Sequence, residues 1–81
     1  MKIRVLLFAR YREAAEGTTQ VEVDVPNGAT IRQVWAQVQL AVPALREEGA
    51  PLFACDREYA RSDRVLTGME EIAAFPPVSG G

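Results

Sequence analysis

Apolar and polar residues alternate along the first part of the chain, which predicts two β-strands. In residues 2–9 one face of an extended segment is wholly apolar and consists of Ile3, Val5 and Leu7. The other face is mixed and consists of Arg4, Leu6 and Phe8. Residues 18–25 alternate valines with polar side chains, as in a strand with one face in water. Because both of its faces carry apolar residues, we expect the first strand to be central, or covered on its second side by a partner protein.

Two segments have the composition or periodicity of helices. Residues 10–16 are good helix formers, and we expect Gly17 at the C-cap of this helix. The main helix is predicted to begin at Thr30, because Thr30 and Gln33 form a capping box. Its apolar positions follow helical spacing and are Ile31, Val34, Trp35, Val38 and Val42. Pro43 then ends the helix.

The second half of the chain is predicted to complete a sheet. Residues 44–48 suggest a short helical turn, and residues 52–55 and 58–60 suggest two short strands. Residues 71–75 form the last strand. This order resembles the ubiquitin-like β-grasp fold, an α+β fold with a mixed sheet and one main helix packed across one face. In that fold the first and last strands lie parallel in the middle of the sheet. We therefore expect one domain over residues 1–75, followed by a flexible tail over residues 76–81.

Length and charge narrow the classes of function. A chain of 81 residues allows one modest core, so a deep and self-contained active site is not expected. The formal net charge is −2, and the basic residues are too dispersed for a nucleic-acid binder. No apolar run approaches the length of a membrane span, and the first residues lack the pattern of a signal peptide. With Cys55 as its single cysteine, the chain is expected to form no internal disulfide and to be cytoplasmic.

The last residues of the sequence carry the clearest chemical signal, and they read Phe75-Pro76-Pro77-Val78-Ser79-Gly80-Gly81. A domain has no structural need for a diglycine end, because glycine loses more backbone entropy on ordering than any other residue. Two residues without Cβ can instead enter a channel too narrow for a side chain. The prolines favour a stiff, extended lead-in, and the six residues 76–81 span at most about 20 Å. The pattern predicts that the carboxylate of Gly81 is the reacting group and that Gly80 helps it to reach a partner's site.

Three segments of the sequence resemble one family over the whole length of the chain. The opening VLLFARYREAAEG, the helix start TIRQVW and the ending AFPPVSGG are similar to the small subunits of molybdopterin synthase, the MoaD-type sulfur carriers. One turn departs from the family pattern. Before the last strand the family tends to have an Asp-Gly-Asp-Glu turn, whereas this chain has Thr67-Gly68-Met69-Glu70-Glu71.

The resemblance implies a route for sulfur through Gly81. A separate, E1-like activating enzyme would adenylate the Gly81 carboxylate with ATP, and sulfur would replace the adenylate to give a thiocarboxylate. The tail would then enter the large synthase subunit and donate sulfur to cyclic pyranopterin monophosphate. The chain itself would be a non-catalytic sulfur donor with no bound cofactor. This agrees with its residues, which include no phosphate-binding loop, no histidine and no paired nucleophile and base.

The predicted partner-binding residues are Phe8, Phe75 and the tail residues Pro76, Pro77, Val78 and Ser79. Phe8 lies opposite the apolar triplet of the first strand, and Phe75 lies where the sheet gives way to the tail. Aromatic side chains are frequent hot spots of protein interfaces. A place in the core is the alternative for both phenylalanines.

Other candidate residues have simpler structural explanations. Cys55 could relay sulfur, and Trp35 could contact a partner, but we expect both in the core. The Asp56-Arg57-Glu58 segment is expected to be a solvated turn, and no metal site is predicted. Two alternatives for the function as a whole stay open. One is a sulfur carrier for thiamine synthesis or tRNA thiolation, and the other is a modifier joined through Gly81 to lysines of target proteins. Lys2 is the only lysine, which weighs against polymeric conjugation.

Overall fold

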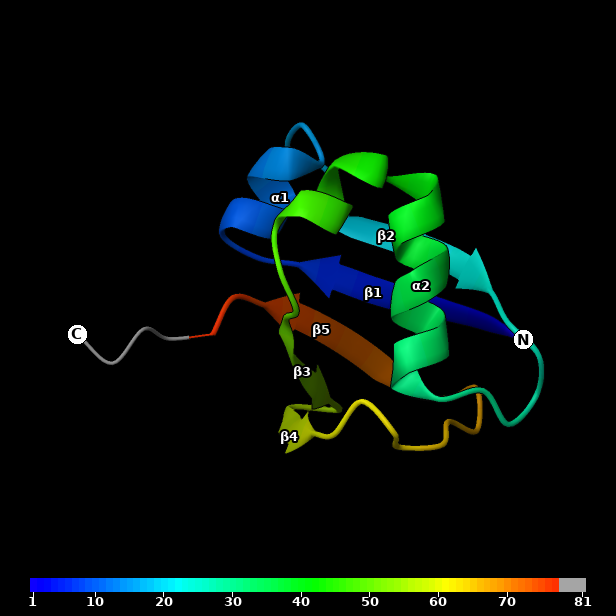
Figure 1. The fold of residues 1–81 in the computed structure, drawn as a ribbon. Coiled ribbons are helices and arrows are strands. Elements are labelled where there is room, and N and C mark those ends of the chain that lie inside the picture. Colours follow the sequence, from blue (N-terminus) through cyan, green and yellow to red (C-terminus); the bar gives the residue numbers. More distant parts are fainter. Residues whose placement is uncertain (78–81) are drawn as a thin grey trace.

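A five-stranded mixed sheet carries the main helix across one face (Figure 1). The computed structural model describes residues 1–77. Its elements are β1 (Lys2–Leu7), α1 (Arg10–Ala14), β2 (Gln20–Asp24), α2 (Ile31–Ala41), the 3-10 helix η1 (Pro43–Glu47), β3 (Leu52–Cys55), β4 (Glu58–Ala60) and β5 (Glu71–Phe75). No helix in this part of the chain is long and apolar enough to cross a membrane. The predicted α+β fold of the ubiquitin-like β-grasp type is confirmed.

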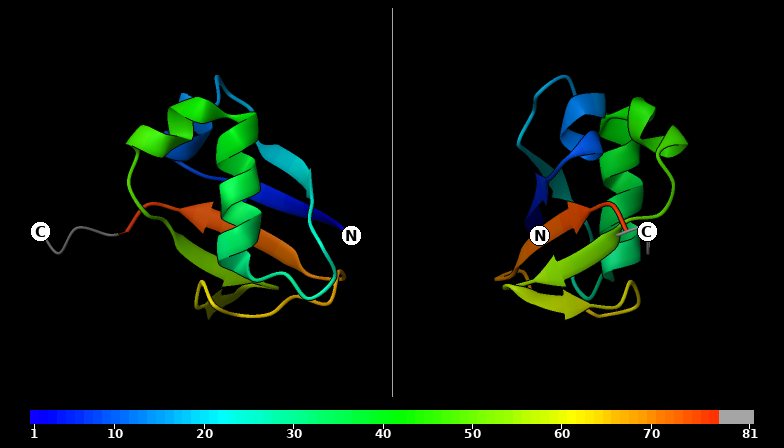
Figure 2. Two further views of the ribbon diagram at one scale, coloured as in Figure 1. Left: turned by 45° about the vertical axis from the view of Figure 1, so that its right-hand side comes forward. Right: turned by 90° about the vertical axis from the view of Figure 1, so that its left-hand side faces the viewer.

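The first and last strands lie side by side in the sheet. The strand order is β2-β1-β5-β3-β4. β1 pairs with β5 in parallel, with Arg4 opposite Glu71 and Leu7 opposite Ala74, and the other pairs are antiparallel. Figure 2 shows from two sides that α2, α1 and η1 all lie on the same face of this sheet. The central position predicted for the first strand is confirmed, and no helix or strand within residues 1–77 covers the opposite face of the sheet.

The core lies between the sheet and α2. The predicted inward triplet of β1 is fully buried, and α2 buries four of its five predicted apolar positions, namely Ile31, Val34, Trp35 and Val38. The ring of Trp35 meets those of Tyr11 and Phe53 edge to face, with centroids 5.6 and 5.8 Å away. The Tyr11 hydroxyl and the Trp35 Nε1 have no hydrogen-bond partner among the described residues. Packing therefore holds these rings, and the core position expected for Trp35 is confirmed.

The predicted capping box sets the start of α2. The Gln33 N–H donates to Thr30 Oγ1 at 3.3 Å, and the Thr30 N–H donates to Gln33 Oε1 at 2.8 Å. A Ser or Thr cap of this kind stabilises a helix by roughly 0.5–2 kcal/mol. α2 ends at Ala41, and Pro43 begins η1, so the turn expected over residues 44–48 is a 3-10 helix over Pro43–Glu47.

Three predicted boundaries are wrong by one to two residues. α1 ends at Ala14 with Ala15 as its C-cap, and Glu16 rather than Gly17 is the first residue with positive φ (57°). β1 ends at Leu7, because Ala9 (φ 52°) turns the chain into α1 and leaves Phe8 just beyond the strand. β2 covers Gln20–Asp24, shorter than the predicted 18–25.

Candidate functional site: the open face of the sheet

The face of the sheet opposite α2 is apolar at the end from which the chain continues toward the tail. Side chains alternate across a strand, so the partners of the buried residues project to this open face. The apolar part, which we call the docking face, consists of Leu6, Phe8, Leu52, Ala54, Tyr59, Ala73 and Phe75. Within it Phe8 is 41% exposed, Leu52 39% and Tyr59 78%. Apolar side chains gathered on one face in this way are typical of a surface that binds another protein.

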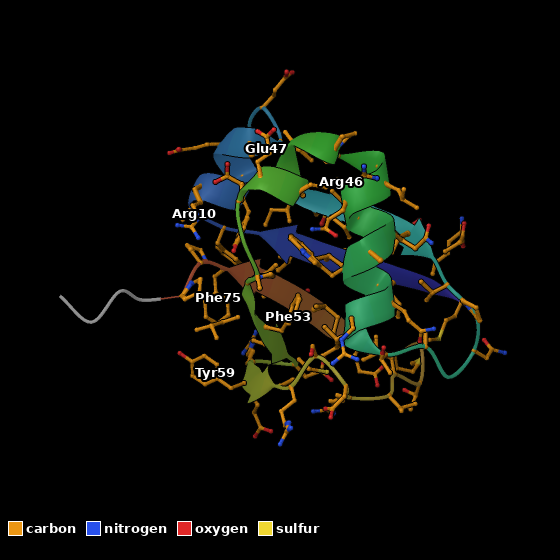
Figure 3. All side chains as sticks on the ribbon, viewed as in Figure 1. Arg10, Arg46, Glu47, Phe53, Tyr59 and Phe75 are labelled. Atoms are coloured by element: carbon orange, nitrogen blue, oxygen red, sulfur yellow. The ribbon has the colours of Figure 1, made fainter. Side chains whose placement is uncertain are left out.

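Phe75 is the last residue of β5 and lies within the docking face. It pairs with Leu52 of β3, and its ring lies beside that of Tyr59, with centroids 5.7 Å apart (Figure 3). These neighbours leave Phe75 half-buried. The sequence did not single out Leu52 and Tyr59. The usable signal was the two-residue period of a strand, which puts Leu52 and Ala54 on the face opposite Phe53 and Cys55.

Phe8 is held next to the end of β5. Its N–H donates to the Ala74 carbonyl at 3.2 Å, which extends the pairing of β1 and β5 by one residue. The Phe8 side chain remains on the surface. The structure thus brings Phe8 and Phe75 to the same end of the same face, and neither side chain belongs to the core.

The chain leaves the sheet at this end of the docking face. β5 ends at Phe75, and the next residues are Pro76, which is half-buried, and Pro77, which is exposed. The predicted site residues Val78, Ser79, Gly80 and Gly81 lie outside the described residues. The predicted lead-in to the tail therefore begins directly beside the exposed aromatic side chains.

Arg10 braces the layer of helices above this end of the sheet. Its Nη2 donates to the Glu48 carbonyl at 3.0 Å, its Nε lies 3.6 Å from Glu48 Oε1, and its guanidinium stacks on the Tyr11 ring at 5.6 Å. Arg10 begins α1 and Glu48 follows η1, so the contact joins the two short helices. Figure 3 shows Arg10 above the end of β5. No sequence pattern predicts this brace, because its two residues are 38 positions apart.

The turn before β5 is held by the side chain of one of its own residues, Glu70. The Glu70 carboxylate accepts hydrogen bonds from the N–H groups of Thr67, Gly68 and Met69 at 2.9 to 3.1 Å. Burial alone would raise the pKa of Glu70, but the backbone hydrogen bonds outweigh it and lower this pKa to about 2. At the next residue, the Glu71 N–H donates to Asp56 Oδ1 at 2.9 Å. These bonds determine where β5 begins and hence which of its residues reach the docking face.

The remaining candidate residues do not form a second site. Cys55 is buried in the core as expected, and this burial raises the pKa of its thiol. Asp56 and Arg57 form the exposed turn between β3 and β4, both with positive φ. Residues 1–77 contain no group of three or more acidic, cysteine or histidine side chains that could hold a metal ion.

Comparison with known proteins identifies the family. The model of the family described as "ThiS family" matches residues 5–81. The chain belongs to the ThiS family. Among curated family relatives, the molybdopterin synthase sulfur carrier subunit of Chlamydomonas reinhardtii is 37% identical over 84 residues and covers both chains completely. The corresponding subunit of Escherichia coli K12 is 36% identical over 80 residues, or 98% of this chain and 99% of the relative. The resemblance found in the sequence is confirmed.

Solved structures show the same fold. The crystal structure of SAMP1 from Haloferax volcanii, also described as small archaeal modifier protein 1, matches with a TM-score of 0.85 and 32% identity. The match covers the whole of both chains. The proteins similar to this chain thus include some named as sulfur carrier subunits and one named as a small archaeal modifier protein.

Proposed function

We propose that this protein is the sulfur carrier subunit of a molybdopterin synthase. The observation that carries the proposal is the position of Phe75, a half-buried aromatic residue of the docking face that directly precedes the Pro76-Pro77 lead-in. A partner that covers the docking face would receive the tail at the same time. The relatives that match over the full length of the chain are named as such carriers, which supports the assignment.

In this proposal the reacting group is the carboxylate of Gly81. A terminal carboxyl has a pKa near 3.3–3.7, so it is an anion at neutral pH and a poor electrophile. Its oxygen would attack the α-phosphorus of ATP on an activating enzyme and release pyrophosphate. A sulfur donor at the oxidation level of sulfide would then attack the acyl carbon and AMP would leave, which gives the thiocarboxylate. Gly80 and Gly81 would let this group enter a narrow site.

The large synthase subunit is the proposed partner that receives the tail and its sulfur. The docking face would bind to it, and the pterin site and the catalytic groups would belong to that subunit. The thiocarboxylate sulfur of the carrier would attack cyclic pyranopterin monophosphate, and water would then hydrolyse the resulting thioester, so that Gly81 regains its carboxylate. No cofactor needs to be bound by the carrier, because ATP is used on the activating enzyme.

Reconstitution with purified components tests the proposal. The carrier is incubated with its activating enzyme, ATP and a sulfur donor, and intact-protein mass spectrometry follows the replacement of one oxygen by sulfur. Adding the large subunit and cyclic pyranopterin monophosphate should consume this species and form molybdopterin. A carrier that acquires the thiocarboxylate but donates it only to a thiazole synthase or a tRNA-thiolating enzyme would contradict the molybdopterin assignment.

A protein modifier is the second candidate, and the match to the archaeal modifier favours it. In that case Gly81 would form an isopeptide bond with a lysine of a target protein. Lys2, the only lysine, lies at the start of β1, at the opposite end of the central strand pair from Phe75. Its Nζ lies 3.9 Å from Glu22 Oε1. An immunoblot of cell extract against the carrier would show a ladder of conjugates for a modifier and a single band for a dedicated sulfur carrier.

A further inference from the structure

The turn before β5 holds a large apolar side chain almost entirely in water. Met69 is 90% exposed, more than any other exposed large hydrophobic residue of the described part of the chain. It stands in the segment at which the sequence departs from the Asp-Gly-Asp-Glu pattern of the family. Neither the sulfur chemistry nor the core accounts for a methionine at this place.

The backbone that carries Met69 is fixed before any partner binds. The Met69 N–H donates to Glu70 Oε1 at 3.1 Å, and the same carboxylate holds Thr67 and Gly68. A preformed turn loses little conformational entropy when a partner covers it. The methionine side chain itself is unbranched and polarizable, so it can fill an irregular apolar pocket.

Met69 lies on the same open face as the docking face. It borders a shallow hollow of about 310 Å³ whose lining residues are Lys2, Arg4, Glu22, Gly68, Met69, Glu70 and Glu71. Arg4 pairs with Glu71 across β1 and β5, and two residues further along Leu6 pairs with Ala73 of the docking face. The open face is therefore continuous from Met69 and the hollow at one end to Phe8 and Phe75 at the other.

The area that a partner must bury indicates whether it also contacts the part of the open face around Met69. Stable complexes bury about 1,200–2,000 Å² with about 20–30 residues on each side, whereas transient encounters bury less. The docking face and the tail offer fewer residues than this. A subunit of a lasting synthase complex needs a wider contact than a carrier that visits its activating enzyme briefly.

We propose that Met69 is a second contact for the large synthase subunit, at the end of the open face remote from the tail. The inference rests on the proposed function. The large subunit would offer an apolar pocket for the methionine side chain, bordered by polar groups that face the hollow. The lining of the hollow on this chain is nearly balanced in charge, with two basic and three acidic side chains. Met69 would thus add to the affinity for the large subunit and not to that for the activating enzyme.

Binding measurements on the full chain test this proposal. Isothermal titration with the cognate large subunit should show about tenfold weaker binding for Met69→Ser and near wild-type binding for Met69→Leu. The rate of Gly81 adenylation by the activating enzyme should stay unchanged for both variants. Leu40→Ser is the matched control, because Leu40 is 59% exposed on α2, and it should bind within about twofold of the wild type.

Three results would overturn the inference. In the first, Met69→Ser binds the large subunit within twofold of the wild type. In the second, it lowers the affinity for the large subunit and for the activating enzyme equally. In the third, it loses no more affinity than Leu40→Ser. Failure of the wild-type carrier to bind any large subunit is a different result, since it would refute the proposed function itself. Because Met69 is almost fully exposed, the melting temperature of Met69→Ser should match that of the wild type and exclude misfolding as the cause.

Discussion

The rings of Tyr59 and Phe75 meet across an intervening strand. Their centroids are 5.7 Å apart and their planes are inclined by 56°, yet β3 separates β4 from β5. Contact is possible because the small Ala54 of β3 is the residue paired with Tyr59. Aromatic pairs contribute about 0.5–1.5 kcal/mol beyond the area they bury. Each ring therefore holds the other in place on the surface and keeps an apolar site ready for a partner.

Replacing Phe75 with aspartate should prevent stable binding of the large subunit while the domain stays folded. The change places a charge at the centre of the docking face, where a buried and unpaired carboxylate is costly. Phe8→Asp should weaken binding in the same way. A pull-down with each variant, together with circular dichroism of the isolated protein, measures both effects. Leu40→Asp, on α2, is the control and should bind normally.

Two outcomes would contradict this use of the docking face. If both phenylalanine variants bind like the wild type, the interface lies elsewhere. If both variants unfold, Phe8 and Phe75 contribute to the core more than their exposure indicates.

Deleting Gly80-Gly81 should abolish sulfur transfer and leave the fold intact. The core residues that the structure describes all precede Pro76, so the melting temperature should change by no more than about one degree. Differential scanning calorimetry and the thiocarboxylate assay measure the two effects on the same preparation. Molybdopterin formation by the shortened chain would refute the assignment of Gly81 as the sulfur-bearing residue.

The Gly81→Ala variant should slow turnover far more than it weakens binding. A methyl group at the reacting end would displace the acyl carbon in a narrow site, and a shift of 1 Å can cost about a hundredfold in rate. Single-turnover kinetics with the large subunit would give the rate, and titration would give the affinity. Equal losses in rate and affinity would assign Gly81 to docking. Leu40→Ala, at an exposed position of α2 away from the tail, is the control.

The Glu70→Gln variant should destabilise the protein by on the order of 1–2 kcal/mol at neutral pH, because the amide replaces a charged acceptor of three backbone N–H groups. The folded-state pKa of Glu70, about 2, lies below its ordinary 4.5. The stabilisation is therefore complete above about pH 5 and is lost as the pH falls through 4.5 toward 2. Urea unfolding at pH 7 and at pH 2 should show the difference between variant and wild type only at pH 7.

The matched control for this prediction is Glu47→Gln, at an exposed carboxylate of η1. It should leave the free energy of unfolding within about 0.5 kcal/mol of the wild type at both pH values. A loss at pH 7 equal to that of Glu70→Gln would show that the general charge balance matters, and not the capped turn.

Local patterns predicted most of the fold. Short segments of strand-like composition predicted β3, β4 and β5 at the observed residues, and the capping box at Thr30 and Gln33 predicted the start of α2. These signals lie within a few positions of one another in the chain. The unpredicted features depend on residues far apart, as in the brace between Arg10 and Glu48 or the contact between Tyr59 and Phe75. Pairing across the sheet decides such contacts, and a sequence pattern does not specify it.

Phe8 and Phe75 illustrate the same limit within the site. Their types and positions predicted a partner surface, but only the sheet order shows that the chain folds them to one end of one face. Met69 gave no signal in the sequence beyond a departure from the family pattern, because its exposure results from the hydrogen bonds of the neighbouring Glu70.

The parallel pairing of β1 and β5 has a mechanical consequence. Met1 precedes the start of β1 and Pro76 follows the end of β5, so the two ends of the chain leave this pair in opposite directions. A force that pulls on the tail while the rest of the chain is held would load the hydrogen bonds between the two strands in shear. All of these bonds would then resist together, whereas in a hairpin pulled from its open end they would break one after another. The domain is therefore built to withstand traction when its tail is withdrawn from a tight-fitting channel.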